Sequence, residues 1–365
     1  MVDFLSLTAT GVAGLHPYQA GKPVEELERE YGVSDAIKLA SNENPLGPGK
    51  LALAAMRKVE EQVSRYPDGN GFKLKHLLAE QHGVTSENIT LGNGSSEILE
   101  LVARTFVIPE NQVIFSEHAF AVYPILTQAV GAKAMITPAK NWGHDLNAMR
   151  DAVTDQTRLI FVANPNNPTG TWLNSNQLHD FLTSIPDHVL VLVDEAYFEY
   201  VKEDVYPNTI NWIDEFHNLI VTRTFSKIHG LAGLRIGYCV SHPEIAELLN
   251  RVRQPFNSNS LALAAAAAAL QDSDHIKKSI ETNSTGLQQL IMAFEKMGLQ
   301  FIPSVGNFIC VEFERGGLEI YEALLHKGVI VRPIDVYGLP RHLRITVGNE
   351  EENNRFIQAL GEVLS

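Results

Sequence analysis

The sequence predicts an α/β protein in which a mostly parallel sheet is sandwiched by helices and a smaller α/β domain is attached. Three observations lead to this fold class. From about residue 89, short apolar runs alternate with amphipathic helical stretches. Several runs are nearly continuous Val, Ile and Leu, as is typical of strands buried on both faces. Strands that alternate with helices favour parallel pairing, with helices packed on both sides of the sheet.

The candidate strands of the large sheet are seven apolar runs within residues 88–241. In chain order they are NITLGN, QVIFSE, AKAMITP, RLIFVANP, VLVLVDE, NLIVTRTF and LRIGYCVS. The run LALAAAAAAL (261–270) predicts a helix whose small side chains let another element pack closely. Because ligands of open α/β sheets bind beyond the carboxyl ends of the strands, the residues that follow each run are the candidates for function.

The pattern changes after about residue 285. A long helix around 272–298 leads to FIPSVGNFICVEF, GVIVRPI and LRITVG, and then to a closing helix in NEEENNRFIQALGEVLS. We therefore predict a large domain over 46–285, and a small domain in which 1–45 join 286–365.

Composition restricts the classes of function. The chain has 365 residues, of which 45% are hydrophobic and 20% charged, as in ordinary globular proteins. We find no membrane-spanning run and no signal peptide. Cys239 and Cys310 lie in apolar runs, which predicts reduced core thiols and a cytoplasmic protein. The net charge of −14 disfavours nucleic acid and membrane partners. No metal-binding motif is present, so we expect no metal.

Two turn segments follow strands. In GNGSSE, Gly94, Ser95 and Ser96 would open a helix and offer N–H groups and hydroxyls to a phosphate, although a tight turn would use the same residues. In NPNNPTG (164–170), two Asn-Pro pairs predict a stiff double turn, which is either a plain loop or a support that fixes the amide of Asn167.

Charged side chains follow the next two strands. Asp194 ends a buried run, where a charge is unfavourable without a partner; a helix N-cap, a ribose contact or a magnesium ligand are the alternatives. Thr224, Ser226, Lys227 and Arg235 can converge on one anion if the intervening glycines fold the chain back. A lysine placed there can lose solvent and have its pKa lowered, as a Schiff-base lysine requires.

The ordered set NPNNPTG, DEAY, TFSK and Arg235, eight residues after Lys227, resembles the fold-type I pyridoxal-phosphate aminotransferases over nearly the whole chain. Within that family, HPYQAGKP (16–23), LASNENPLGP (39–48), RYPDGNG (65–71), VRPI and LRITVG are similar to segments of histidinol-phosphate aminotransferases. The resemblance implies pyridoxal 5′-phosphate as cofactor. It also implies a ping-pong transamination of L-histidinol phosphate with 2-oxoglutarate, giving imidazole acetol phosphate and L-glutamate, in histidine biosynthesis.

The resemblance also implies roles around the cofactor ring. Lys227 matches the lysine that forms the internal aldimine and then moves a proton between substrate Cα and cofactor C4′. Asp194 matches the partner of the pyridinium nitrogen. Asn167 and Tyr197 match the donors to the phenolate oxygen. Phe120 matches the aromatic residue stacked on the ring, although His-Ala stands before it where many relatives have Pro-Thr.

The phosphate contacts follow from the same match. The implied cup consists of Gly94, Ser95, Thr224, Ser226 and Arg235, with Ser96 as a further contact. Tyr66 matches a tyrosine that reaches the cofactor phosphate of the neighbouring subunit, which implies a homodimer with a shared active site; a simple turn residue is the alternative.

The implied substrate contacts lie near the two ends of the chain. Arg344 matches the arginine that binds an α-carboxylate in a bidentate manner, and a structural ion pair is the alternative. Arg332 and Tyr18 match groups that bind the substrate phosphate or the distal carboxylate of glutamate. We also expect Asn42 to line the substrate side.

Other functions stay open at this point. An aromatic amino acid aminotransferase or a phosphothreonine decarboxylase would use the same scaffold. A nucleotide-binding oxidoreductase is disfavoured because no complete G-x-G-x-x-G motif occurs. A non-catalytic binding protein would not need Lys227.

Overall fold

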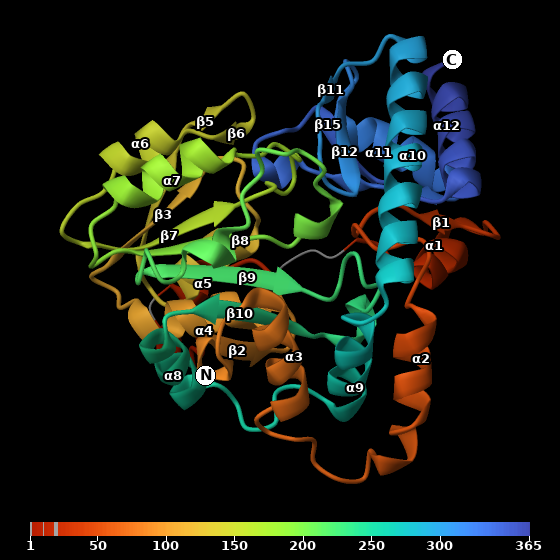
Figure 1. The fold of residues 1–365 in the computed structure, drawn as a ribbon. Helices are drawn as coiled ribbons and strands as arrows, with labels where there is room; N and C mark the ends of the chain where they lie inside the picture. Colours follow the sequence, from red (N-terminus) through yellow and green to blue (C-terminus); the bar gives the residue numbers. More distant parts are fainter. Residues whose placement is uncertain (1, 10, 18–20) are drawn as a thin grey trace.

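The structure, a computed structural model, describes residues 2–9, 11–17 and 21–365 (Figure 1). Its centre is a seven-stranded sheet of order β2-β10-β9-β8-β7-β3-β4. The strands are β2 (Ile89–Gly92), β3 (Gln112–Ser116), β4 (Lys133–Thr137), β7 (Thr157–Ala163), β8 (Leu190–Asp194), β9 (Leu219–Thr224) and β10 (Gly237–Ser241). Each lies within one predicted run, except that β7 begins one residue before its run, at Thr157. β10 runs antiparallel to both of its neighbours and the other pairings are parallel, so the predicted mostly parallel sheet is confirmed.

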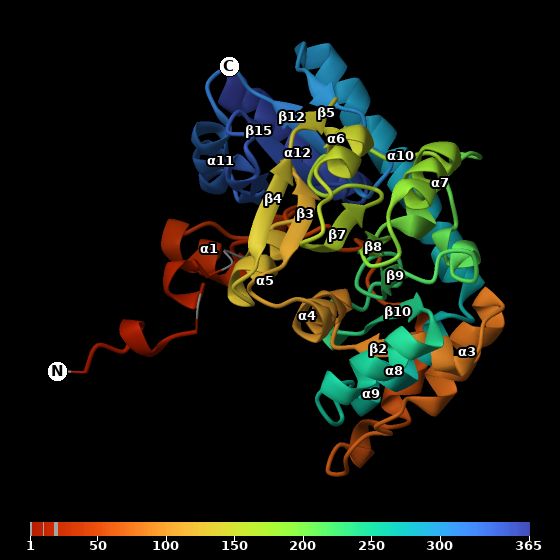
Figure 2. The same cartoon turned by 90° about the vertical axis from the view of Figure 1, so that its left-hand side faces the viewer.

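Helices cover both faces of this sheet, as predicted (Figure 2). One apolar core forms against α2 (Lys50–Arg57), α3 (Phe72–His82), α6 (Leu146–Asp151), α7 (Ser175–Ser184) and α9 (Ser260–Ala269). The other forms against α4 (Ser95–Phe106), α5 (Val122–Ala129) and α8 (Pro243–Val252). In β8 the alternation is direct, because Val191 and Val193 face the first core and Leu190 and Leu192 face the second. Cys239 and Cys310 are free and buried.

A smaller antiparallel sheet, of order β11-β12-β15-β14, follows in the chain. Its strands are β11 (Phe301–Ile302), β12 (Phe308–Glu312), β14 (Arg332–Pro333) and β15 (His342–Thr346), packed against α10 (Ser273–Met297), α11 (Gly317–His326) and α12 (Glu350–Leu364). Both predicted helices of this region, α10 and α12, are present. The domain boundary at residue 285 stays a prediction, and α10 runs through it.

The N-terminal part of the described chain joins this smaller unit. After α1 (Val24–Tyr31), the short strand β1 (Ile37–Lys38) pairs in parallel with β13 (Val329–Ile330). A hairpin of β5 (Ala139–Lys140) and β6 (Gly143–His144) stands apart from both sheets in the pairing pattern. No helix in the described part of the chain combines the length and apolar character needed to cross a bilayer.

Strand register brings separate segments of the sequence to one edge of the large sheet. Ala163 is the register partner of Asp194, and Asp194 that of Thr222. At the start of the antiparallel strand, Gly237 lies opposite both Thr224 and Gly92. The carboxyl ends of β7, β8 and β9, and the turn that follows β2, therefore share one edge.

We predict that Phe294→Ala in α10 lowers the free energy of unfolding by about 3–5 kcal/mol, because it empties a fully buried site between α10, Phe301 and Phe356. Urea unfolding measures the change. Met292→Ala on the same helix is the control: its side chain is 60% exposed, so we expect a change within about 0.5 kcal/mol. Equal effects of the two variants would contradict the packing described here.

Candidate active site

A cavity of about 390 Å³ lies at this edge of the large sheet, between it and the smaller sheet. It is lined by most of the residues predicted for the site: Asn42, Ser95, Ser96, Phe120, Asn167, Asp194, Tyr197, Thr224, Ser226, Lys227, Arg235, Arg332 and Arg344. Side chains predicted from eight separate stretches of sequence thus meet in one place.

Lys227 follows β9 and reaches into this cavity. Its Nζ donates a hydrogen bond to the carbonyl oxygen of Ser41 at 2.9 Å. The pKa of Lys227 is lowered to about 7, chiefly by burial and also by the positive charges of Arg344 and Arg235, against the opposing effect of Glu43 and Asp194. A substantial fraction of this amine is therefore neutral near neutral pH, as a nucleophile or a proton acceptor must be.

Asp194 ends β8 at the floor of the cavity and is 6% exposed. Its two carboxylate oxygens accept hydrogen bonds from Tyr123 Oη (3.0 Å) and Thr222 Oγ1 (3.2 Å). Burial raises the pKa of the carboxyl, and the two hydrogen bonds oppose that shift. Because both side-chain donors are neutral, a cation in the cavity is the partner that would stabilise the charged form.

Sequence reasoning missed both of these donors. Thr222 lies two residues before Thr224, so the alternation of β9 places the two hydroxyls on one face. Tyr123 lies about one helical turn after Phe120, and the two rings meet edge to face with centroids 5.8 Å apart. Strand and helix periodicity are therefore the signals that point to them.

Tyr197 and Asn167 also line the cavity. Asn42 Nδ2 donates to Tyr197 Oη at 2.8 Å, and burial raises the pKa of Tyr197 to about 12. Arg344 Nη1 donates to Asn167 Oδ1 at 2.5 Å, so the amide nitrogen is the end of Asn167 that can donate to a ligand. Tyr197 and Asn167, which we predicted to donate to the phenolate oxygen of the cofactor, are thus each hydrogen-bonded by a residue that we predicted to contact the substrate. These residues are Asn42 and Arg344, respectively.

An anion cup forms where α4 begins. Gly94 precedes the first residue of α4 with a φ of 78°, and a Cβ there would lie 2.4 Å from Arg235 Nη2. Arg235 Nη1 donates to Ser226 Oγ at 3.4 Å, and Ser226 N donates to Thr224 Oγ1 at 3.1 Å. Arg235 itself has a φ of 55°, an unfavourable backbone for a residue with a side chain. A strained arginine and a helix N-terminus therefore face one small space, which suits a phosphate.

Arg332 and Arg344 lie directly opposite each other on β14 and β15. Both are buried, at 8% and 5% exposure, and both line the cavity. Arg344 Nη2 donates to the Ala40 carbonyl oxygen at 2.8 Å, and Arg344 Nε has no hydrogen-bond partner among the described residues. Like charges directly across two strands are destabilising. An anion between the guanidinium groups would offset that repulsion.

Of the predicted residues that the structure describes, Tyr66 lies elsewhere. Tyr66 is 82% exposed, outside the cavity, and stacks on Phe256 with ring centroids 4.6 Å apart. Tyr18 lies outside the described residues, so its predicted contact is not described. His118, two residues before Phe120, is buried, and its Nδ1 lies 2.7 Å from the carbonyl oxygen of Tyr337.

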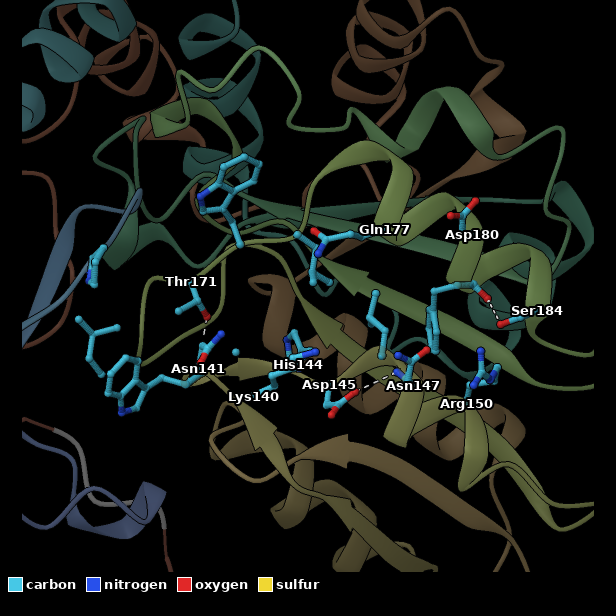
Figure 3. A pocket seen from close by; sticks show the side chains of 18 residues that line it. Lys140, Asn141, His144, Asp145, Asn147, Arg150, Thr171, Gln177, Asp180 and Ser184 are labelled. Carbon is cyan, nitrogen blue, oxygen red and sulfur yellow. Dashed lines mark hydrogen bonds between the residues drawn. The ribbon is translucent and has the colours of Figure 1, made fainter.

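A larger cavity of about 630 Å³ lies between the β5–β6 hairpin, α6 and α7 (Figure 3). Side chains such as Arg150 on α6 and Asp180 on α7 line it. His144 sets its Nε2 2.9 Å from the carbonyl oxygen of Ala163, and burial lowers its pKa to about 4, so it is neutral. None of the residues predicted for the site lines this cavity, so volume alone does not identify a site.

Comparisons with known proteins agree with this picture. The family model of aminotransferase class I and II matches residues 34–360. "Histidinol-phosphate aminotransferase 1" of Nitrosococcus oceani is 60% identical over 361 residues, covering 99% of this chain and 98% of that protein. "Histidinol-phosphate aminotransferase 2" of Pseudomonas aeruginosa is 54% identical over 367 residues, covering 100% of both. The crystal structure of histidinol-phosphate aminotransferase from Sinorhizobium meliloti in complex with pyridoxal-5′-phosphate superposes with a TM-score of 0.90 at 30% identity, covering 97% of this chain and 96% of that one.

We predict that, in protein without added ligand, acetylation of Lys227 by a brief pulse of acetic anhydride rises through about pH 7, because its neutral fraction rises there. Mass spectrometry of the peptides measures the labelling. The exposed Lys202 is the control, and its labelling is followed in the same samples. Arg344→Gln removes a positive charge that lowers the pKa of Lys227, so its labelling curve should move to higher pH. A Lys227 curve that coincides with that of Lys202 would disprove the lowered pKa.

Proposed function

The chain belongs to the class I and II aminotransferases, and on that premise we propose that it transfers the amino group of L-histidinol phosphate to 2-oxoglutarate. The products are imidazole acetol phosphate and L-glutamate, and the reaction serves histidine biosynthesis. The observation that carries the proposal is one cavity in which a lysine of pKa about 7 meets a buried aspartate, an anion cup and two buried arginines. The buried free thiols suit a reducing compartment such as the cytoplasm.

The cofactor is pyridoxal 5′-phosphate, and the described residues fit it. Asp194 is a buried carboxylate bonded by neutral hydroxyls, and a protonated ring nitrogen supplies the positive partner that it needs. The cup around Gly94 and Arg235 suits the phosphate, since a side chain at 94 would fill it. When bound, the cofactor supplies a ring that accepts the electron pair left behind when the substrate carbon loses its proton.

Lys227 is the residue that we assign to proton transfer. Its pKa of about 7 suits a group that takes a proton from the substrate carbon and returns one to the cofactor side, because catalysis is most efficient when the pKa lies near the working pH. The Ser41 carbonyl, 2.9 Å from Nζ, gives the amine a fixed direction. Tyr197 and Asn167 would donate to the ring oxygen of the bound cofactor, and Phe120 would cover the face of its ring.

The two arginines explain how one cavity serves two different substrates. Histidinol phosphate brings a phosphate, and 2-oxoglutarate brings two carboxylates. We assign the phosphate and the distal carboxylate to Arg332, and the α-carboxylate to Arg344, whose planar guanidinium suits bidentate binding. Each substrate places negative charge between two side chains that otherwise repel each other. This sharing fits a ping-pong sequence in which one substrate leaves before the other binds.

We further propose that the functional unit is a homodimer whose active sites are shared. Tyr66 carries this proposal: it lies outside the cavity of its own chain and is 82% exposed, and Val63 (63%) and Phe72 (69%), which are close to it in the sequence, are also exposed. Exposed aromatic and apolar side chains in one region are typical of a surface that another subunit covers. In the dimer, Tyr66 would contribute to the phosphate cup of the neighbouring subunit.

The test of the function is a substrate panel with purified protein. We predict that kcat/KM with histidinol phosphate exceeds that with phenylalanine or tyrosine, and that no turnover occurs without an oxo acid. Arg332→Ala should raise the KM for histidinol phosphate by roughly 10- to 100-fold, because it removes a charge-assisted hydrogen bond. Arg344→Ala should do the same for 2-oxoglutarate.

The control for these variants is Arg341→Ala, because Arg341 is an exposed neighbour that pairs with Glu312 outside the cavity. Its kinetic constants should stay at the parent values. Higher kcat/KM with the aromatic amino acids would identify an aromatic aminotransferase instead. An unchanged KM for histidinol phosphate in Arg332→Ala would refute the assigned phosphate contact.

We predict that Lys227→Ala abolishes transamination, and that Tyr66→Ala weakens cofactor binding and activity. Mixed and re-associated, the two variants should regain activity, because one site of each hybrid dimer then has Lys227 from one chain and Tyr66 from the other. Activity and light scattering of the mixture measure this recovery. Lys227→Ala mixed with the double variant Lys227→Ala/Tyr66→Ala is the control and should stay inactive. A mixture that forms hybrids without recovery would show that Tyr66 serves its own chain.

A further inference from the structure

A buried ion pair lies behind the cofactor site. Arg223 donates from Nε and Nη2 to Glu195 Oε2 at 2.9 and 2.7 Å. Glu195 is 0% exposed and Arg223 3%. Among the ion pairs of the described residues, it alone has both side chains almost fully buried. None of the roles assigned above uses either residue.

The pair occupies the face of the large sheet opposite the cofactor. Glu195 follows Asp194, and its N–H donates to the Thr222 carbonyl at 2.9 Å, which continues the ladder between β8 and β9. Side chains alternate along strands, so Glu195 extends the row of Val191 and Val193, which face α7 and α9. Arg223 likewise lies between two threonines whose hydroxyls point to the cavity side. The two charges thus stand where the pattern of both strands calls for apolar side chains.

The remaining polar groups of the pair are also bonded. Glu195 Oε1 accepts from Thr209 Oγ1 at 2.5 Å and from Thr209 N at 3.3 Å. Arg223 Nη2 donates to Asn208 Oδ1 at 2.7 Å, and the ring of Phe198 lies 3.4 Å from the guanidinium carbon. Glu195 therefore closes the loop 195–209 on itself, and this loop contains Tyr197.

A buried ion pair rarely adds stability compared with apolar side chains of the same size, because its desolvation offsets the attraction. Such pairs also fix the orientation of neighbouring groups, and here the groups that are oriented can be named. Asp194 and Thr224 are each the immediate chain neighbour of a member of the pair, and Tyr197 lies within the loop that the pair closes. Any slip of β8 against β9 would break the pair and turn these side chains away from the cavity.

We propose that Glu195 and Arg223 are positioning residues, which lock the ends of β8 and β9 so that Asp194, Tyr197 and Thr224 meet the cofactor in register. The inference rests on the cofactor assigned under the proposed function, and not on the amine substrate. Neither residue touches the cofactor, because the sheet separates them from the cavity.

The test measures cofactor binding without substrates. Apoprotein variants are titrated with pyridoxal 5′-phosphate, and the visible circular dichroism per bound cofactor reports how the ring is held. The key variant is Glu195→Leu/Arg223→Met, which replaces the pair by apolar side chains of similar size. We expect apoprotein that melts within a few degrees of the parent, at least about tenfold weaker cofactor binding, and a reduced dichroic signal. Parental affinity and dichroism in a folded double variant would overturn the proposal.

A milder pair of variants covers the case in which the double variant does not fold. Thr209→Val removes one donor to Glu195 at constant shape, and Thr209→Ser keeps it. We expect severalfold weaker cofactor binding with Val and parental binding with Ser. Equal binding by Thr209→Val and the parent would equally overturn the proposal.

Asn88→Leu is the matched control for a structural effect. Asn88 is 6% exposed and donates to the Ser241 carbonyl at 2.9 Å, at the end of the sheet away from the cavity. This variant should lower the melting temperature and leave cofactor affinity and dichroism unchanged. Because no amine or oxo acid enters the titrations, a wrong substrate assignment would fail the substrate panel and leave these results intact.

Discussion

The site depends on one constraint: the carboxylate of Asp194 is buried at the end of a central strand and must be stabilised there. Burial disfavours its charge, and hydrogen bonds from Tyr123 and Thr222 only partly oppose this. The strand order determines which segments of the chain surround this carboxylate. Because β8 lies between β7 and β9, the segments that carry Asn167 and Lys227 leave the sheet on either side of Asp194. The sheet thus arranges the site around a charge that needs a cationic partner.

Electrostatics in this protein are local. The chain as a whole carries a net charge of −14, yet Lys227, Arg235, Arg332 and Arg344 all line one cavity of about 390 Å³. Burial in this cavity lowers the pKa of Lys227, and the positive charges of Arg344 and Arg235 add to that shift. Anion binding and activation of the lysine are therefore two results of one arrangement.

Much of this could be predicted from the sequence, because the strands of the large sheet are apolar at nearly every position and the polar residues that follow them stand out. Lys227, Asp194 and Asn167 were identified in that way, with the resemblance to known aminotransferases assigning their roles. Contacts between distant segments could not be predicted. Tyr123 and Asp194 are 71 residues apart, and Asn42 and Tyr197 are 155 apart. Such contacts depend on how helices and sheets pack, and the periodicity of apolar residues in the sequence does not predict that packing.

The facing arginines of the smaller sheet have a consequence for which molecules the site rejects. A ligand that brings negative charge beside Arg332 and Arg344 would lower their mutual repulsion. A neutral aromatic side chain at the same place would leave that repulsion unchanged. If the proposed function holds, the pair would disfavour uncharged competitors as well as attract anions. Selectivity of this kind does not require side chains that fit the shape of the correct substrate.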